Sequence, residues 1–133
     1  YAVFANGGYL ITPHLVDDNR NWRSRKHLQK VDIQEKTLDT IRNGLRKVVT
    51  SGSGLKINLD TSIIPPVAGK TGTAEDSSGG PDHAWFAGFA PYESGEIVIV
   101  AFAQNTPGGG SVHALPMARQ VLETWHLIRS SKS

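Results

Sequence analysis

The stretch Ala68-Gly69-Lys70-Thr71-Gly72-Thr73-Ala74 decides how this 133-residue chain folds. Two prolines directly before it force an extended approach, and we predict a strand over residues 67–74 in spite of its glycines. Side chains alternate along a strand, so Lys70 and Gly72 share one face. The two threonines, Thr71 and Thr73, share the other. A lysine ammonium and threonine hydroxyls suit a carboxylate, and Gly72 leaves room for another backbone. The stretch therefore predicts a strand that binds a peptide-like ligand, which could add as a further strand.

The tripeptide Gly69-Lys70-Thr71 also occurs in phosphate-binding loops, and this alternative can be tested on the sequence. Such a loop requires an earlier glycine, here at position 64, and a helix directly after the lysine. Position 64 is an isoleucine, and Pro65-Pro66 occupy what should be a flexible loop. Gly72 also makes a following helix unfavourable. We therefore reject a phosphate loop.

The segments before the stretch predict one helix and weak strands. Residues 1–5 are compatible with a helix, and residues 9–16 and 27–31 with short strands, the first interrupted by Pro13. A helix is expected over residues 32–50, capped by Asp32 with Glu35 at the capping-box position. Its apolar stripe falls at steps of three, four and three: Leu38, Ile41, Leu45 and Val48. Residues 51–66 are expected to form a connector.

The segments after the stretch predict a hairpin and a closing helix. Strands are expected over residues 83–90 and 96–104, joined by a turn at 92–95 into an antiparallel hairpin. Both are apolar on alternate and intervening positions, which is typical of a strand covered on both faces. The helix over residues 115–128 packs through one stripe: Ala118, Val121, Leu122 and Trp125. The fold class is α+β, and part of the second sheet face is expected to be covered by elements outside this sequence.

The composition indicates one folded domain and excludes several kinds of site. Hydrophobic residues make up 38% and charged residues 20%, as in globular proteins. Lysine plus arginine is 14 and aspartate plus glutamate is 12, and the net charge of +2 does not favour nucleic acid. The absence of cysteine excludes disulfides and cysteine zinc sites, and the five histidines lack metal-site spacing, so no cofactor is expected. No apolar run reaches the roughly 18 residues of a membrane span.

Five segments spread over nearly the whole chain carry a family resemblance. They are Ala5-Asn6-Gly7-Gly8 with Thr12-Pro13-His14, Gly44-Leu45-Arg46-Lys47-Val48-Val49, the stretch 68–74, His83-Ala84-Trp85-Phe86-Ala87-Gly88-Phe89-Ala90-Pro91, and Ala114-Leu115-Pro116. In this order they resemble the C-terminal part of the transpeptidase domain of class B penicillin-binding proteins, and most of all its elongation-type members. Lys-Thr-Gly is one of three signatures of penicillin-binding proteins and serine β-lactamases. The resemblance implies the serine β-lactamase/D,D-transpeptidase-like fold.

The resemblance also implies an activity and roles for four residues. In this family a serine attacks the D-Ala-D-Ala bond of a peptidoglycan stem peptide, and the acyl-enzyme passes to a neighbouring amine or is trapped by a β-lactam. Lys70 would set the electrostatics around the nucleophile and the substrate carboxylate. Thr71 and Thr73 would hydrogen-bond that carboxylate, and the Thr73 backbone N–H would be one arm of the oxyanion hole. Gly72 would leave room for the ligand.

Two further signatures of the family, Ser-x-x-Lys and Ser-x-Asn, should accompany this strand. The chain contains one formal Ser-x-x-Lys, at Ser53 and Lys56, but Ser53 lies between glycines after a helix, whereas the nucleophile should open one. No Ser-x-Asn occurs. Residues 1–133 are therefore expected to be the C-terminal part of one domain, inactive alone, with the nucleophile upstream. The abrupt apolar start at Tyr1 favours the same interpretation.

Partners and location follow from the resemblance as further expectations. The partners would be peptidoglycan stem peptides, β-lactams, the missing N-terminal part of the domain, and a glycosyltransferase of the elongation machinery. The location would be the periplasm or the outer face of the inner membrane, with an anchor outside this chain. Two other functions remain open: a β-lactam sensor domain, which membrane helices and a signalling domain upstream would indicate, and, ranked last, a serine β-lactamase.

The remaining candidates near the strand have ordinary structural interpretations. Trp85 and Phe86 could line a cleft, but aromatic residues on a buried strand are mostly core. His83 at a strand end is expected to be structural or solvated, and His113 solvated. The loop over residues 75–82 borders the strand and could gate a cleft.

Overall fold

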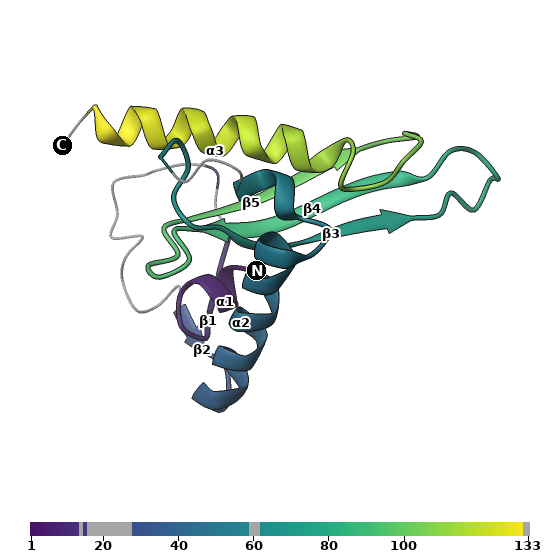
Figure 1. The fold of residues 1–133 in the computed structure, drawn as a ribbon. Helices are drawn as coiled ribbons and strands as arrows, with labels where there is room; N and C mark the ends of the chain where they lie inside the picture. Colours follow the sequence, from purple (N-terminus) through teal and green to yellow (C-terminus); the bar gives the residue numbers. More distant parts are fainter. Residues whose placement is uncertain (14, 16–27, 59–61, 132–133) are drawn as a thin grey trace.

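The computed structural model describes residues 1–13, 15, 28–58 and 62–131. The elements in chain order are α1 (Ala2–Ala5), β1 (Tyr9–Ile11), β2 (Leu28–Lys30), α2 (Glu35–Ser51), the 3-10 helix η2 (Leu55–Asn58), β3 (Ala68–Ala74), β4 (His83–Ala90), β5 (Ile97–Ala103) and α3 (Ala114–Ser130). Helix α3 lies along one side of the larger sheet, and α1, α2 and the small β1–β2 ribbon gather at the other side (Figure 1). This α+β arrangement confirms the predicted fold class.

The larger sheet has the order β3-β4-β5 and is antiparallel throughout. In its register Lys70 is opposite Ala87, which is opposite Val100 on β5. The chain continues as a strand to Ala74 after Lys70, so no helix follows the lysine and the phosphate loop is excluded. The predicted strand and hairpin are both confirmed.

The main core lies between the sheet and α3. Phe86 and Ala84 of β4 are fully buried there, as is Leu122 of α3. The other buried members of this cluster come from α2, η2, the approach to β3, β4, β5 and α3: Val49, Ile57, Ile64, Val67, Ala90, Ile99, Ala101, Ala114, Leu115 and Ala118. The Phe86 ring extends over a pair of facing glycines, since a side chain added at Gly69 would meet its Cζ atom at 2.6 Å.

The opposite face of the sheet is covered only at one end among the described residues. There Phe89 is fully buried with Ala5 and Ala68 in a second, smaller cluster. Further along, Val98, Val100 and Phe102 of β5 are 40%, 60% and 40% exposed. Trp85 is 39% exposed and stacks on Phe102, with ring centroids 4.3 Å apart, so its interpretation as core is wrong, whereas that of Phe86 is confirmed. Part of this face is therefore left uncovered by the described residues, as expected for a face that elements outside this sequence cover.

Helix α2 differs from its sequence-based prediction at both ends. Its N-cap is Gln34, with no side-chain cap, rather than Asp32. The Val31 N–H donates to the Gly8 carbonyl and the Ile33 N–H to the Val31 carbonyl, each at 2.9 Å, so Asp32 lies in a tight turn before the helix begins. Near the other end Val49, not Val48, is the fully buried side chain. Periodicity alone does not distinguish two adjacent apolar positions on a turn of helix.

Smaller differences concern α3, the early strands and the connector. In α3, Ala118 and Leu122 are buried as predicted, but Val121 is 52% exposed. Strand β1 covers only the first residues of the predicted 9–16 segment, and it pairs antiparallel with β2. Residues 14 and 16–27, which include parts of both predicted strands, lie outside the described residues. The connector contains η2, which the sequence analysis missed.

The glycine pair under Phe86 gives a stability prediction. Gly69→Ala should lower the free energy of unfolding by about 1–3 kcal/mol, because the new methyl group overlaps the Phe86 ring and the Ala87 carbonyl. Gly44→Ala, on the exposed side of α2 with no atom within 4 Å of the added carbon, should instead raise it by about 0.5–1 kcal/mol. Urea unfolding of both variants tests this, and an unchanged midpoint for Gly69→Ala contradicts it.

Candidate functional site

Strand β3 is an edge strand of the described sheet, because it pairs with β4 on one side only. The exposure of its central side chains follows the predicted alternation at Lys70 and Thr71 but not at Thr73, which is exposed although it shares a face with Thr71. Thr71 is buried at 8% exposure, Lys70 and Thr73 are exposed, and Gly72 is half-buried. The strand therefore presents a cation, a hydroxyl and an open stretch of backbone side by side.

The Lys70 ammonium lies along the strand rather than away from it. Its Nζ atom donates a hydrogen bond to the Thr71 carbonyl at 2.8 Å. Backbone groups two residues apart point to the same side of a strand, so the Thr73 N–H lies on the side of that carbonyl. An ammonium and a backbone donor on one side of an edge strand suit an anionic, peptide-like ligand.

The Thr71 hydroxyl points to the covered side of the strand. Its Oγ1 atom lies 2.6 Å from the Oγ atom of Ser53, in the turn after α2. The sequence analysis considered Ser53 only as a nucleophile and rejected it. The structure supports that rejection, because Ser53 does not open a helix and Lys56 follows it in η2. The contact between Ser53 and Thr71 was missed, because eighteen residues separate them and no spacing rule joins a turn to a strand.

A glycine-rich loop after β5 packs directly against the same strand. A side chain added at Gly110 would meet the Gly72 carbonyl at 2.6 Å and the Gly72 nitrogen at 2.9 Å. One added at Gly109 would overlap the Thr73 hydroxyl. Gly109 also has φ of +71°, which disfavours any other residue. The sequence predicted a loop here but gave no sign that it touches the strand.

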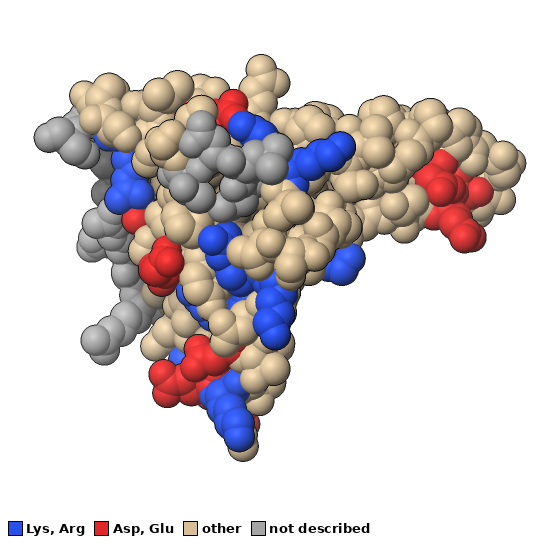
Figure 2. Space-filling view, in the orientation of Figure 1, with Lys and Arg blue, Asp and Glu red and all other residues tan. Residues whose placement is uncertain are grey.

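The loop between β3 and β4 projects from the body of the molecule, and acidic side chains gather on this arm (Figure 2). The loop carries Glu75, Asp76 and Asp82. Hydrogen bonds from the Ser78 hydroxyl at 2.6 Å and the Ser78 N–H at 3.0 Å lower the pKa of Asp76. The loop thus contains a local turn held by a carboxylate, beside the exposed end of β3.

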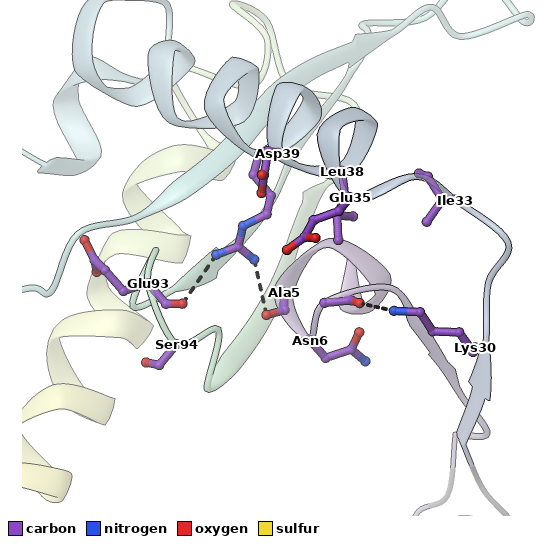
Figure 3. A pocket seen from close by; sticks show the side chains of 11 residues that line it. Ala5, Asn6, Lys30, Ile33, Glu35, Leu38, Asp39, Glu93 and Ser94 are labelled. Atoms are coloured by element: carbon purple, nitrogen blue, oxygen red, sulfur yellow. Dashed lines mark hydrogen bonds between the residues drawn. The ribbon is translucent and has the colours of Figure 1, made fainter.

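A cavity of about 720 Å³ lies at the opposite end of the molecule, between α1, α2, β2 and the β4–β5 turn (Figure 3). Its two cations are already engaged by the backbone. Lys30 donates to the Gly7 carbonyl at 2.9 Å, and Arg42 donates to the carbonyls of Phe4, Ala5, Tyr92 and Glu93. No residue of β3 lines this cavity. It is therefore separate from the predicted ligand-binding strand.

Two histidines of the described region, His83 and His113, have structural contacts. His83 is half-buried, and its Nδ1 accepts a hydrogen bond from the Asn105 N–H at 3.1 Å, as expected for a structural residue. His113 is half-buried beside the Pro107 carbonyl rather than fully solvated. Over the described ranges, no group of His, Asp and Glu side chains is arranged to hold a metal ion.

Comparison with known proteins gives one matching family. The family described as "Penicillin binding protein transpeptidase domain" matches residues 1–123. A curated relative, the peptidoglycan D,D-transpeptidase MrdA of Haemophilus influenzae, is 30% identical over 144 aligned positions. The alignment covers 92% of this chain but only 22% of that relative, so the chain spans about a fifth of the relative's length.

Solved structures of the same kind are similar in fold. Penicillin-binding protein 2 of Helicobacter pylori, solved with MreC, superposes with a TM-score of 0.73 at 26% identity, covering 94% of this chain and 23% of that one. Penicillin-binding protein A of Mycobacterium tuberculosis, solved as an imipenem acyl-enzyme, gives a TM-score of 0.69 at 26% identity, covering 91% and 28%.

The Asp76 turn yields a prediction on pH. A group with a lowered pKa stabilises the folded turn above its ordinary pKa of about 3.9, and this contribution is lost as the pH falls through the lowered value. An NMR titration should therefore give Asp76 a pKa below its ordinary value, and Ser78→Ala should return it toward that value. Ser77→Ala is the matched control and should leave it unchanged. An ordinary pKa for Asp76 in the unsubstituted chain contradicts the prediction.

Proposed function

The chain belongs to the penicillin-binding protein transpeptidase domain family, and from that premise we propose that it is the C-terminal part of a peptidoglycan D,D-transpeptidase domain. In the proposed reaction a serine oxygen attacks the D-Ala-D-Ala peptide carbonyl of a stem peptide. The terminal D-Ala leaves as its amine, and an amine of a neighbouring strand then displaces the serine. The observation that carries the proposal is the edge strand β3, with Lys70 and Thr73 exposed beside Gly72.

In this proposal β3 binds the acyl donor along its open side. Lys70 provides positive charge near the nucleophile and the substrate carboxylate. The Thr73 N–H provides one donor to the oxyanion, and removal of one such donor costs about 10²–10³ in rate in other enzymes. The hydroxyls of Thr71 and Thr73 bind the carboxylate, and Gly72 lets the donor's backbone approach. The Lys70 hydrogen bond to the Thr71 carbonyl supports this, because it holds the ammonium on the strand.

The serine nucleophile of the proposed enzyme lies outside these 133 residues. Ser53 is a poor candidate, since its Oγ is 2.6 Å from a threonine hydroxyl and it lies in the turn after α2 rather than at the start of an α-helix. A nucleophile needs an adjacent base or a lowered pKa. We therefore propose that the sequence before Tyr1 in the complete protein supplies Ser-x-x-Lys and Ser-x-Asn.

The first partner in this proposal is that N-terminal part of the same domain. The uncovered side chains of β5 and the groove of about 470 Å³ beside α3, lined by Ile97, Val121 and Trp125 among others, form apolar surfaces on both sides of one free strand edge. Such surfaces usually mark an interface. Stem peptides, β-lactams and a glycosyltransferase of the elongation machinery are the further proposed partners.

The proposed location is the periplasm or the outer face of the inner membrane. Among the described residues, none of the helices has the length and apolar character needed to span a membrane. In this proposal an N-terminal helix in another part of the complete protein provides the anchor.

Labelling with a fluorescent penicillin tests the function. Residues 1–133 alone should not be labelled, whereas the complete protein, with its upstream Ser-x-x-Lys, should be. Lys70→Ala in the complete protein should slow labelling by about a hundredfold or more, the scale of losing one group that stabilises charge in an active site. Lys47→Ala, an exposed lysine on α2, is the control and should have no effect. Covalent label on the 133-residue chain would contradict the proposal.

Sedimentation tests the proposed interface. At micromolar concentration the 133-residue chain should associate through its uncovered sheet face, and Val100→Lys should shift it toward a monomer by placing a charge on that face. Thr40→Lys on the exposed side of α2 is the matched control. A single monomeric species for the unsubstituted chain would argue against the interface.

A further inference from the structure

Thr71 is the one polar side chain that is buried among the described residues. A buried hydroxyl without a partner is costly, and the partner here is the Ser53 hydroxyl at 2.6 Å. Ser53 itself is exposed, so the pair bridges the covered side of β3 and the surface. A strand residue proposed to bind a carboxylate thus has its hydroxyl held by a residue from another element.

Ser53 is held in place by the backbone of its own turn. Helix α2 ends at Ser51, and the N–H groups of Gly52 and Gly54 both donate to the Val48 carbonyl, at 3.1 and 2.9 Å. Gly54 is buried so close to Val49 that an added side chain would meet it at 2.9 Å. The Ser53 hydroxyl therefore reaches β3 from a turn that packs on the main core, independently of any ligand.

Only one of the two hydroxyl protons lies in this hydrogen bond, and either hydroxyl can donate it. Each hydroxyl has one O–H donor and can accept through its lone pairs. If Thr71 donates to a carboxylate, its Oγ1 must accept from Ser53. A charged ligand strengthens this series of hydrogen bonds from Ser53 through Thr71 to the carboxylate. A hydrogen bond to an ionised acceptor is roughly twice as strong as one between neutral groups.

From this geometry we propose that Ser53 is a positioning residue that orients the Thr71 hydroxyl toward the carboxylate of a bound acyl donor. The proposal rests on the function proposed above and adds a residue outside the signature strand. Threonine has a stiff side chain whose χ1 angle fixes where its hydroxyl points. Ser53 acts through Thr71 and needs no contact with the substrate.

The test is penicillin acylation of the complete protein, carried out with benzylpenicillin and with its methyl ester. Ser53→Ala should slow acylation by the free acid about three- to tenfold. This is the effect expected from the loss of one hydrogen bond that supports the bond from Thr71 to the carboxylate. It should change acylation by the ester, which lacks the carboxylate charge, less than about twofold. Ser53→Thr, which keeps a hydroxyl, should restore the rate. Ser51→Ala is the matched control, because the Ser51 hydroxyl donates to the Lys47 carbonyl within α2.

The outcomes separate this inference from the proposed function. An unsubstituted complete protein that is not acylated refutes the proposed function, and the positioning role with it. Acylation that is equally fast in Ser53→Ala refutes the positioning role alone. An equal loss with the acid and the ester also refutes it, since a general packing role would affect both ligands alike.

Discussion

The packing of the Phe86 ring across the facing glycines of β3 and β4 is the contact on which this structure depends. Gly69 and Gly88 lie opposite each other, and a side chain at either position would meet the ring within about 3 Å. Their lack of side chains lets the ring lie flat over the ladder and enter the core beneath α3. Because a slip of one residue would turn every side chain of β3 to the other face, this contact also fixes which side Lys70 presents.

Two arginines of α2 connect that sheet to the rest of the chain. Arg46 donates to the Val67 carbonyl at 2.6 Å, directly before β3, and lies over the Tyr92 ring. Arg42 lies over the rings of Phe89 and Tyr92, with its Cζ 5.1 and 5.3 Å from their centroids, and binds carbonyls of α1 and of the β4–β5 turn. Guanidinium groups suit this role because they offer five donors in one plane. They bind carbonyls of neighbouring elements, so the start of β3 is also held by a contact from outside the sheet.

The sequence could predict the elements that depend on local pattern, but not the contacts between elements. Continuous apolar runs predicted β4 and β5, and the two prolines before residue 67 predicted an extended approach to β3, since these signals lie within or next to one segment. The start of α2 was missed, because the pairing of Val31 with Gly8 competes with capping by Asp32. The exposure of Trp85 was missed for a different reason. A strand that is apolar on both sides predicts that both faces of the sheet are buried, but it does not say which segments bury them. The described residues bury only the face toward α3 fully.

The proposed site therefore divides into what β3 carries and what surrounds it. The strand carries the recognition groups, and three separate segments fix them: β4 through the ladder, the Ser53 turn through the Thr71 hydroxyl, and the glycine loop through Gly72 and Thr73. Each of these segments is anchored in the main core beneath α3 or beside it. In the proposed function, a strand held by these three contacts is already positioned before any ligand arrives, which lowers the ordering cost of binding. The chemistry of acyl transfer can then reside on a different segment, because the binding strand does not depend on the nucleophile for its shape.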